Sequence, residues 1–243
     1  MTNGDSNNII VKRNQPCPCG KSSDALQVYG DGYSTCYSGK CGGTTFWPER
    51  KPIEAKHISI RGLSEKTVKL LDIKTVMDHE GVPDLVGFTY PNGNVKYRRM
   101  KVQLNGSNKY FSLRDHPVEG LLFSDKVSGG KYVTVTEGEF DAASVIDMTG
   151  YPAYPAIGKK LSEESFNKLN SYERIYVCAD NDTAGRAHAE KFVSHFHHSK
   201  CYIVELKKHN DPNDYLIAGD KGVFTKEWWA ARPWSPDDVL CSP

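Results

Sequence analysis

The chain has 243 residues, of which 38% are hydrophobic, and its formal net charge at pH 7 is +1. This length allows one large domain or two to three small ones. The near-neutral charge limits any nucleic-acid-binding surface to a local patch. No apolar run approaches the roughly 18 residues of a membrane span, and the polar stretch 1–8 is unlike a signal peptide. We therefore expect a cytoplasmic protein.

Residues 1–47 form the first predicted domain, which contains two close cysteine pairs, Cys17 with Cys19 and Cys36 with Cys41. Four thiolates suit the tetrahedral coordination of structural Zn²⁺. An odd total of seven cysteines favours a metal site in a reducing compartment over a disulfide framework. The pattern predicts a zinc ribbon with one zinc ion, although its C-x-C and C-x4-C spacings depart from the usual C-x2-C. The alternative is four unliganded surface thiols.

The next two predicted segments are a charged linker bracketed by prolines, 48–56, and a basic α+β subdomain, 57–116. Serine is a preferred residue at the N-cap of a helix, and an Asn-Gly pair is a strong signal for the turn of a β-hairpin. The expected elements are a helix at 64–71 capped by Ser64, and two strands, 85–90 and 95–104, joined by the turn at Asn92-Gly93.

The second strand of this hairpin is basic and carries interleaved aromatic residues, and Lys109 follows it. Such a strand suits a phosphate backbone or a nucleoside triphosphate. The alternative is a solvated edge strand that uses charge to prevent aggregation. Strand alternation places Arg99 and Lys101 on one face, and Lys96 and Arg98 on the other.

Residues 117–220 alternate strand and helix, which predicts βαβ units and an α/β fold with a mainly parallel sheet. A C-terminal helix and tail occupy 221–243. The predicted strands are 131–136, 153–157, 173–179 and 201–206, and the predicted helices are 139–148, 162–170, 183–197 and 223–231.

Acidic residues follow three of these strands. Glu137 ends the first, Asp180 and Asp182 follow the third, and Asp211 and Asp214 follow the last. The carboxyl ends of parallel strands line one crevice, where ligands bind. Mg²⁺ takes hard oxygen ligands and shares them with phosphates. The pattern therefore predicts metal-assisted phosphoryl or nucleotidyl chemistry, although Asp182 is also a candidate helix N-cap.

These motifs resemble the Toprim signature, a Glu on one strand and D-x-D on another. The order of zinc ribbon, basic region and Toprim domain resembles DnaG-type primases, and most closely the primase half of the primase-helicases of short-tailed phages. The matching stretches are 135–141, 180–186, 61–64, 92–94, 207–214 and 234–238.

The resemblance implies a DNA primase that joins ribonucleotides on single-stranded DNA. It implies about two catalytic Mg²⁺ or Mn²⁺ ions, ribonucleoside triphosphates as substrates, and a fused or separate replicative helicase and a DNA polymerase as partners. In a phage-encoded protein, the compartment would be the host cytoplasm. The carried-over roles are catalytic and metal-binding for Glu137, Asp180, Asp182 and Asp211, metal-binding also for Asp214, substrate-binding for Arg61, Arg98, Arg99, Lys101 and Lys109, and template-binding for Asp31 and Tyr33.

Several alternatives remain open. Glu137 is either a metal ligand or the base that accepts the hydroxyl proton, and the spacing does not separate Asp211 from Asp214. Tyr33 stands where the phage relatives carry a histidine, so the template sequence is undetermined. The rival functions are a Toprim nuclease, which uses the same carboxylates for hydrolysis, and a non-catalytic zinc and Toprim recombination mediator.

Overall fold

A computed structural model of the chain describes residues 10–17, 20–29, 34–38, 45–46, 55–78, 81–101, 109–112 and 117–235. It contains two compact units, one made of 1–54 with 103–107 and the other of 55–102 with 108–243. Four predicted site residues, Cys19, Asp31, Tyr33 and Cys41, lie outside the described residues. Their roles therefore stay predictions.

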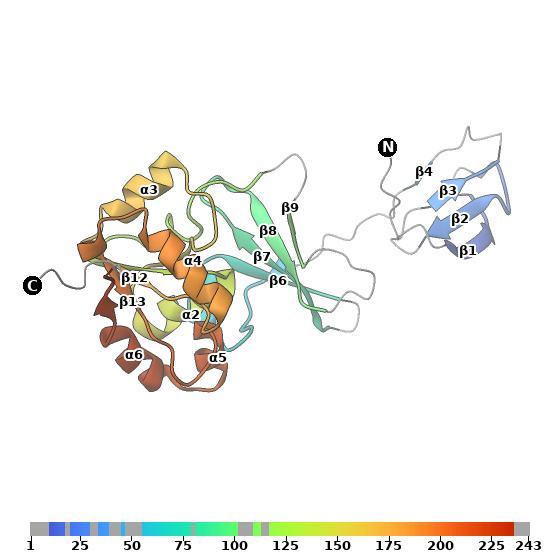
Figure 1. Ribbon diagram of the computed structural model, residues 1–243. Helices are drawn as coiled ribbons and strands as arrows, with labels where there is room; N and C mark the ends of the chain where they lie inside the picture. The colour runs from blue at the N-terminus through green and yellow to red at the C-terminus, as the bar shows by residue number, and fades with distance from the viewer. Residues whose placement is uncertain are drawn as a thin grey trace, which may run out of the picture. The chain divides into compact units, whose positions relative to one another are not determined.

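The first unit contains a four-stranded antiparallel sheet (Figure 1). Its small core consists of Cys17, Leu26 and Cys36, and both cysteines are at most 5% exposed. A tight turn follows Cys17, whose carbonyl accepts from Gly20 N at 2.9 Å, and Gly20 has a φ of +70°. The sheet thus brings one cysteine of each predicted pair into the same core. Its strands are β1 (Ile10–Gln15), β2 (Leu26–Tyr29), β3 (Ser34–Cys36) and β4 (Thr45–Phe46), in the order β1-β2-β3-β4.

An antiparallel five-stranded sheet begins the second unit. Ser64 caps its helix as predicted, accepting from Thr67 N, and the Asn92-Gly93 turn joins the predicted hairpin. The second hairpin strand ends at Arg99 rather than at Leu104. The elements are β5 (Ala55–Lys56), α1 (Glu65–Leu70), β6 (Ile73–Met77), β7 (Pro83–Thr89), β8 (Val95–Arg99) and β9 (Tyr110–Ser112), in the sheet order β5-β6-β7-β8-β9. Strand β5 lies inside the stretch expected as a linker, and β6 and β9 were not predicted.

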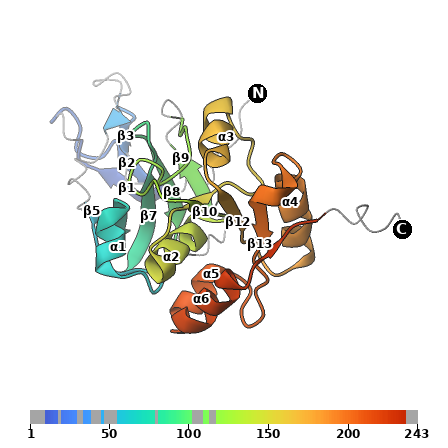
Figure 2. The same cartoon turned by 90° about the vertical axis from the view of Figure 1, so that its left-hand side faces the viewer.

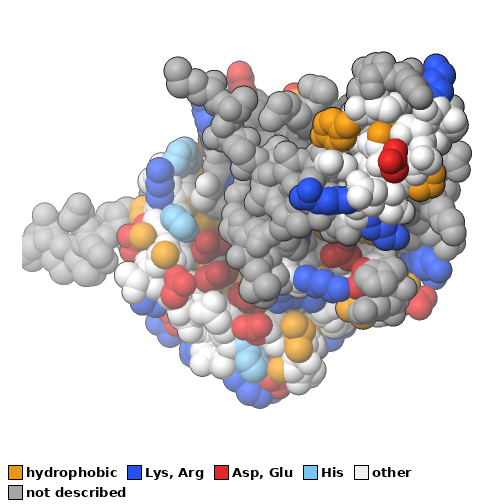
Figure 3. All heavy atoms as spheres, turned by 90° about the vertical axis from the view of Figure 1, so that its right-hand side faces the viewer, with side chains coloured by type: hydrophobic (Ala, Val, Ile, Leu, Met, Phe, Trp, Pro, Cys, Tyr) orange, Lys and Arg blue, Asp and Glu red, His pale blue; other side chains and the backbone are white. Residues whose placement is uncertain are grey.

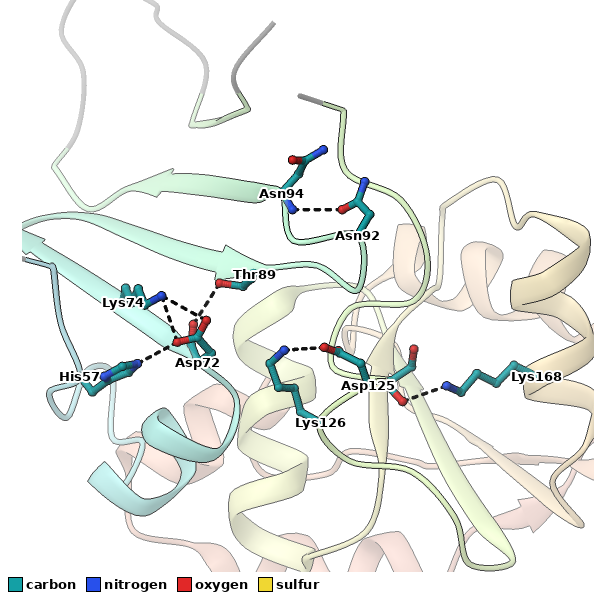
Figure 4. Close-up of polar contacts among 10 residues, drawn as sticks. His57, Asp72, Lys74, Thr89, Asn92, Asn94, Asp125, Lys126 and Lys168 are labelled. Atoms are coloured by element: carbon teal, nitrogen blue, oxygen red, sulfur yellow. Dashed lines mark hydrogen bonds and ion pairs between the residues drawn. The ribbon is translucent and has the colours of Figure 1, made fainter. Parts of the chain in front are cut away.

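Polar contacts fix the turns of this sheet (Figure 4). Asp72, in the turn after α1, accepts from His57 at 2.9 Å and from Lys74 at 3.2 Å. In the hairpin turn, Asn94 N donates to the Asn92 side chain at 3.2 Å. These contacts hold the start of β6 and the β7–β8 connection, and hence the register of the basic strand.

The rest of the second unit is built on a mainly parallel sheet, which confirms the predicted α/β fold class. Strand order is β11-β10-β12-β13-β14, and only β14 runs antiparallel to its neighbour. The elements are β10 (Tyr132–Thr136), α2 (Glu139–Thr149), β11 (Ala153–Pro155), α3 (Glu163–Asn170), β12 (Arg174–Val177), α4 (Thr183–Val193), a 3₁₀ turn (His198–Lys200), β13 (Cys201–Ile203), α5 (Pro212–Ile217), α6 (Lys221–Trp229) and β14 (Arg232–Pro233).

Helices cover both faces of this sheet (Figures 1 and 2). Helices α2, α5 and α6 pack together on one face, and α3 and α4 lie on the other. This division follows from right-handed crossovers, because the chain moves along the sheet in opposite directions through α2 and through α3 and α4. The C-terminal helix α6 forms as predicted, and it docks on this sheet through the buried Trp228, which donates to Thr134 Oγ1 at 2.9 Å and stacks on Tyr176 with ring centroids 4.3 Å apart.

Two helix predictions were wrong. The helix expected at 183–197 ends at Val193, and residues 198–200 form the separate 3₁₀ turn. Helix α5 was missed altogether, although Asp211 at its N-cap and Pro212 in its first turn are common helix-start signals. From the sequence, Asp211 is interpreted only as an acidic residue that follows the last predicted strand.

A single core joins the two sheets of the second unit. Phe88 of β7 meets Phe140 of α2 edge to face, with ring centroids 5.2 Å apart. The start of α2 is therefore packed directly against the sheet that contains the basic strand. Among the described residues, no helix is both long enough and apolar enough to cross a membrane.

Candidate active site

The structure brings the predicted acidic residues to the carboxyl edge of the parallel sheet. Strands β10 and β12 are neighbours, so Glu137 and Asp180 follow adjacent strand ends. Asp180 N donates to Glu137 Oε1 at 3.2 Å. Asn181 N donates to the Asn210 carbonyl at 2.8 Å, which ties the loop after β12 to the loop that carries Asp211. The structure thus brings the loops that carry Glu137, Asp180 and Asp211 together at this edge.

Two of these carboxylates also cap helices. Asp182 Oδ1 accepts from Gly185 N at 2.7 Å at the start of α4, and Asp211 Oδ1 accepts from Asp214 N at 2.8 Å at the start of α5. An ionised carboxylate has two oxygens and about four acceptor sites. Each cap therefore fixes the carboxylate and leaves its second oxygen available to a cation.

Asp141 joins this group, although it was not among the predicted site residues. Burial, followed by the charges of Asp211 and Asp180, raises the pKa of Asp141 to about 7. Its carboxylate fills the space over Gly138, where an added Cβ would overlap Oδ2. The signal for Asp141 was its position in the first turn of a helix that starts directly after Glu137.

Mutual repulsion marks the centre of the group at Asp180. Burial raises the pKa of Asp180 to about 6, with further contributions from Glu137, Asp211, Asp182 and Asp214 in that order. Asp211 acts on both Asp141 and Asp180, whereas Asp214 is the last contributor to Asp180 alone. Between the two alternatives left by the spacing, Asp211 is therefore the more central.

The donor chemistry of the group fits Mg²⁺ or Mn²⁺. All its donors are carboxylate oxygens, and their repulsion is relieved by a divalent cation. Within the described part of the chain, no three His, Cys, Asp or Glu side chains already form a complete metal-binding set. Mg²⁺ does not require one, because it usually keeps several waters and binds one or two carboxylates together with substrate phosphates.

Three of the predicted basic residues lie beside the carboxylates. The guanidinium groups of Arg61 and Arg98 lie 5.1 and 4.9 Å from the ring of Phe140, at the start of α2. Arg98, burial and Arg61 lower the pKa of Lys109, and Asp141 opposes them. Arg61, Arg98 and Lys109 thus form a cationic group that faces the acidic one.

Arg99 and Lys101 do not join this group. The Arg99 guanidinium lies 4.5 Å from the Phe111 ring, and its buried Nε has no hydrogen-bond partner among the described residues. Lys101 forms an ion pair with Asp78. The alternation of β8 explains the separation, because Arg98 shares its face with Tyr110 of β9 while Arg99 lies on the opposite face.

A buried side chain, Asn213, connects the basic and acidic groups. Its Oδ1 accepts from Arg61 Nε at 2.6 Å, and its Nδ2 donates to the Arg61 carbonyl at 2.9 Å and to Ser144 Oγ at 3.0 Å. Asn213 is 0% exposed and lies in α5, between Asp211 and Asp214. Arg61 is thereby held against the loop that supplies the third acidic motif, a connection that the sequence did not indicate.

Two further contacts were not predicted. The buried Glu139 accepts from Lys96 at 2.6 Å and from Lys159 at 3.4 Å, which ties β8 and the loop after β11 to the start of α2. His188 of α4 places its Nδ1 3.3 Å from Glu137 Oε2. Glu137 is therefore contacted at both oxygens, by Asp180 N at one and by His188 at the other.

Residues 134–216 match the Toprim-like family. The chain is also 23% identical over 261 residues to the DNA helicase/primase of Enterobacteria phage T3. That similarity covers 93% of this chain and 44% of the phage protein, so the chain spans less than half of this relative's length.

Solved structures of primases share the fold. The primase fragment of the bacteriophage T7 primase-helicase is 21% identical, with a TM-score of 0.55 over 90% of this chain and 99% of that fragment. The zinc-binding and RNA polymerase domains of the Aquifex aeolicus primase are 17% identical, with a TM-score of 0.55 over 71% of this chain and 54% of that one. The expected resemblance to primases is confirmed.

The Toprim carboxylates should make stability depend on pH and on divalent cations. The pKa of Asp180 is raised to about 6 and that of Asp141 to about 7, from 3.8 for both. Raised carboxyl pKa values stabilise the folded state below the unfolded-state pKa, and this contribution is lost as pH rises through the folded values. In EDTA, the contribution of these two carboxyl groups to the melting temperature should therefore fall between about pH 4 and pH 7.

Mg²⁺ should restore much of this loss at the alkaline end and little at the acidic end, where protons already neutralise the group. Scanning calorimetry across this range, with Mg²⁺ or with EDTA, measures both effects. A melting temperature that rises equally with Mg²⁺ at both ends would contradict the assignment of these carboxylates.

Substitution of Asn213 by alanine should loosen Arg61 and weaken the site. The change removes the partners of Arg61 Nε and of the Arg61 carbonyl and one of the two partners of Ser144 Oγ, which costs about 1–3 kcal/mol of unfolding free energy. It should also lower the activity of the site beyond what the stability loss explains. The matched control is Asn210→Ala in the loop just before α5, because the Asn210 side chain is exposed. Equal kinetics for the two variants would show that the Asn213–Arg61 connection has no role in the site.

Proposed function

We propose that the chain is a DNA primase, an enzyme that synthesises short RNA primers on single-stranded DNA. The observation that carries the proposal is the juxtaposition of a Toprim carboxylate group, centred on Asp180, with the cationic group of Arg61, Arg98 and Lys109. A divalent cation and a triphosphate together would neutralise both groups. The similarity to a phage helicase/primase and the shared fold of primase structures support the same function.

The carboxylates would hold the catalytic cations. Asp180, Asp182 and Asp211, with Asp214 as a further candidate, would bind Mg²⁺ or Mn²⁺, which supplies charge neutralisation at the attacking and leaving oxygens when bound. Glu137 either joins these ligands or accepts the proton of the attacking 3′-hydroxyl. Its Oε1 accepts a hydrogen bond from Asp180 N. The other oxygen, Oε2, lies beside His188 and is the atom that would bind the cation or accept the proton.

The cationic group would position the substrate. Arg61, Arg98 and Lys109 would hold the triphosphate so that the 3′-hydroxyl of one ribonucleotide attacks the α-phosphate of the next and pyrophosphate leaves. Such catalysis depends mainly on placement and charge neutralisation. Arg99 and Lys101 remain candidates from the resemblance alone, and their opposite face suits a more distant phosphate of the nucleic acid.

The N-terminal unit would bind the template. Cys17, Cys19, Cys36 and Cys41 would hold one structural zinc ion, and the joint burial of Cys17 and Cys36 supports this set. Asp31 and Tyr33 would contact template bases. The proposed partners are a helicase, fused or separate, and a DNA polymerase. The proposed compartment is the cytoplasm, which for a phage-encoded protein is that of the host cell.

The test is incubation of the protein with single-stranded DNA of mixed sequence, labelled ribonucleotides and Mg²⁺. Short labelled RNA that requires the DNA would support the proposal, and sequencing it would reveal the start site. Cleavage of the DNA without RNA synthesis would favour the Toprim nuclease. DNA binding with neither reaction would favour the non-catalytic mediator.

A further inference from the structure

A groove lies between α3 and α4, on the face of the parallel sheet opposite α2. Its volume is about 590 Å³, within the range of ligand sites, and the loop 158–162 closes one side of it. The floor is apolar, formed by Leu161, Phe166 and Phe192. Phe166 stacks on Phe196 beneath it, with ring centroids 4.8 Å apart. The groove therefore offers aromatic surface on this face of the Toprim domain.

The rim of this groove is basic. His188 and Lys191 lie on α4, His195 follows the end of this helix, and Lys159 and Lys160 lie on the facing loop. Glu163 is the one acidic residue in the lining. Within the described ranges, Lys160 and Lys191 form no ion pair, so both charges are available to an anion. In the space-filling view, His and Lys or Arg side chains lie next to a group of Asp and Glu side chains (Figure 3).

The groove opens beside the carboxylate group. His188 belongs to its rim and contacts Glu137 Oε2 at 3.3 Å. Lys159 belongs to the rim and contacts Glu139 at 3.4 Å. A chain of linked phosphates that leaves the catalytic carboxylates can therefore enter the groove past His188, which contacts Glu137 and also lines the groove.

We propose that the α3–α4 groove binds single-stranded nucleic acid next to the catalytic centre, through backbone phosphates on Lys160 and Lys191 and bases against the phenylalanine floor. The inference rests on the proposed primase function and adds a strand path that the motifs did not indicate. Its chemistry is that of other single-strand sites, which combine a cationic groove with aromatic surfaces on which bases stack.

Charge reversal of the two unpaired lysines tests the proposal. The full-length Lys160→Glu/Lys191→Glu variant is compared with Lys66→Glu/Lys226→Glu, which makes the same charge change on exposed positions of α1 and α6. The probe is fluorescein-labelled oligothymidylate, and its Kd is measured by anisotropy over a series of NaCl concentrations. Neutralising one phosphate contributes about 0.7 to the slope of log K against log salt for single strands.

The groove variant should bind the oligothymidylate more weakly than the control variant, and its salt slope should be smaller by about 1.4, which corresponds to two lost phosphate contacts. Its KM for the DNA template should rise while kcat stays within about twofold, because uniform binding is lost without loss of transition-state contacts. Identical Kd values and slopes for the two variants would overturn the groove assignment.

The two proposals can fail separately. If the wild-type protein synthesises RNA and both variants bind alike, the groove assignment is wrong and the primase function stands. If no protein synthesises RNA and the groove variant alone loses affinity and salt slope, the groove assignment stands and the primase function is wrong.

Discussion

Replacement of Asp180 by asparagine should abolish RNA synthesis while making the metal-free protein more stable. Burial, Glu137 and Asp211 raise the pKa of Asp180 to about 6, so its ionised form at neutral pH is held against burial and repulsion. Relief of one pKa unit of repulsion is worth about 1 kcal/mol, or roughly 2–4 °C in melting temperature for a unit of this size. The same change removes a side chain that we propose as a central metal ligand.

The expected loss of activity exceeds about 100-fold, because mutation of residues that only support a metal ligand already lowers metal affinity or activity by about 10–100-fold. Stability is measured in EDTA and in Mg²⁺, and synthesis of the first dinucleotide is measured in Mg²⁺ and in Mn²⁺. The variant should lose the stabilisation that Mg²⁺ gives the wild-type protein at alkaline pH. If Asp180→Asn melted at a lower temperature than the wild-type protein in EDTA, Asp180 would stabilise the fold itself, and its assignment as a cation ligand would be contradicted.

Alanine at Gly185 should damage both stability and activity, although alanine normally favours helices. An added Cβ at Gly185 would overlap the carbonyl oxygen of Asp180, which is backbone and has no rotamer to change. Relieving such an overlap costs about 1–3 kcal/mol. It would also move the backbone that carries Asp180, and a displacement of about 1 Å at a catalytic centre can cost 100-fold in rate.

Gly222→Ala is the matched control. Gly222 lies in α6, where an added Cβ would meet nothing within 4 Å. The control should be neutral or more stable by about 0.5–1 kcal/mol, which is the usual gain for alanine over glycine within a helix. Thermal unfolding and dinucleotide synthesis compare the two variants. If Gly185→Ala and Gly222→Ala had the same stability and activity, the close contact between α4 and the Asp180 backbone would be contradicted.

The sequence predicted the features that local chemistry determines. Ser64 and Asn92-Gly93 marked a helix start and a hairpin, and both form as expected. The alternation of strands and helices after residue 130 gave the parallel sheet, and its geometry placed Glu137 and Asp180 on adjacent strand ends. These are short-range signals or direct consequences of sheet topology.

The features that were missed depend on packing between distant segments. Strands β5, β6 and β9 carry weak local signals and exist because they pair with neighbours in one antiparallel sheet. Asn213 joins Arg61 from 152 positions away in the sequence. Asp141 enters the acidic group because the folded chain places the start of α2 beside Asp180 and Asp211, which follow other strands.

Strand alternation predicted the separation within the basic residues, but not which face meets the carboxylates. The resemblance assigned Arg98, Arg99 and Lys101 together to the substrate. Packing determines which face of β8 meets the carboxylates. Arg98 packs against Phe140 of α2, whereas Arg99 lies on the opposite face against Phe111. A face can be assigned from sequence only when one side of the strand is plainly apolar, and β8 is cationic on both.

The central claim is that the Toprim carboxylates form a divalent-cation centre for RNA synthesis. Rapid-quench measurement of the first dinucleotide on single-stranded DNA, as Mg²⁺ is titrated, tests it most directly. We predict a rate that saturates with Mg²⁺ in the wild-type protein and is lost both in EDTA and in Asp180→Asn. Dinucleotide formed at the wild-type rate by Asp180→Asn, or a rate independent of divalent cations, would contradict the claim.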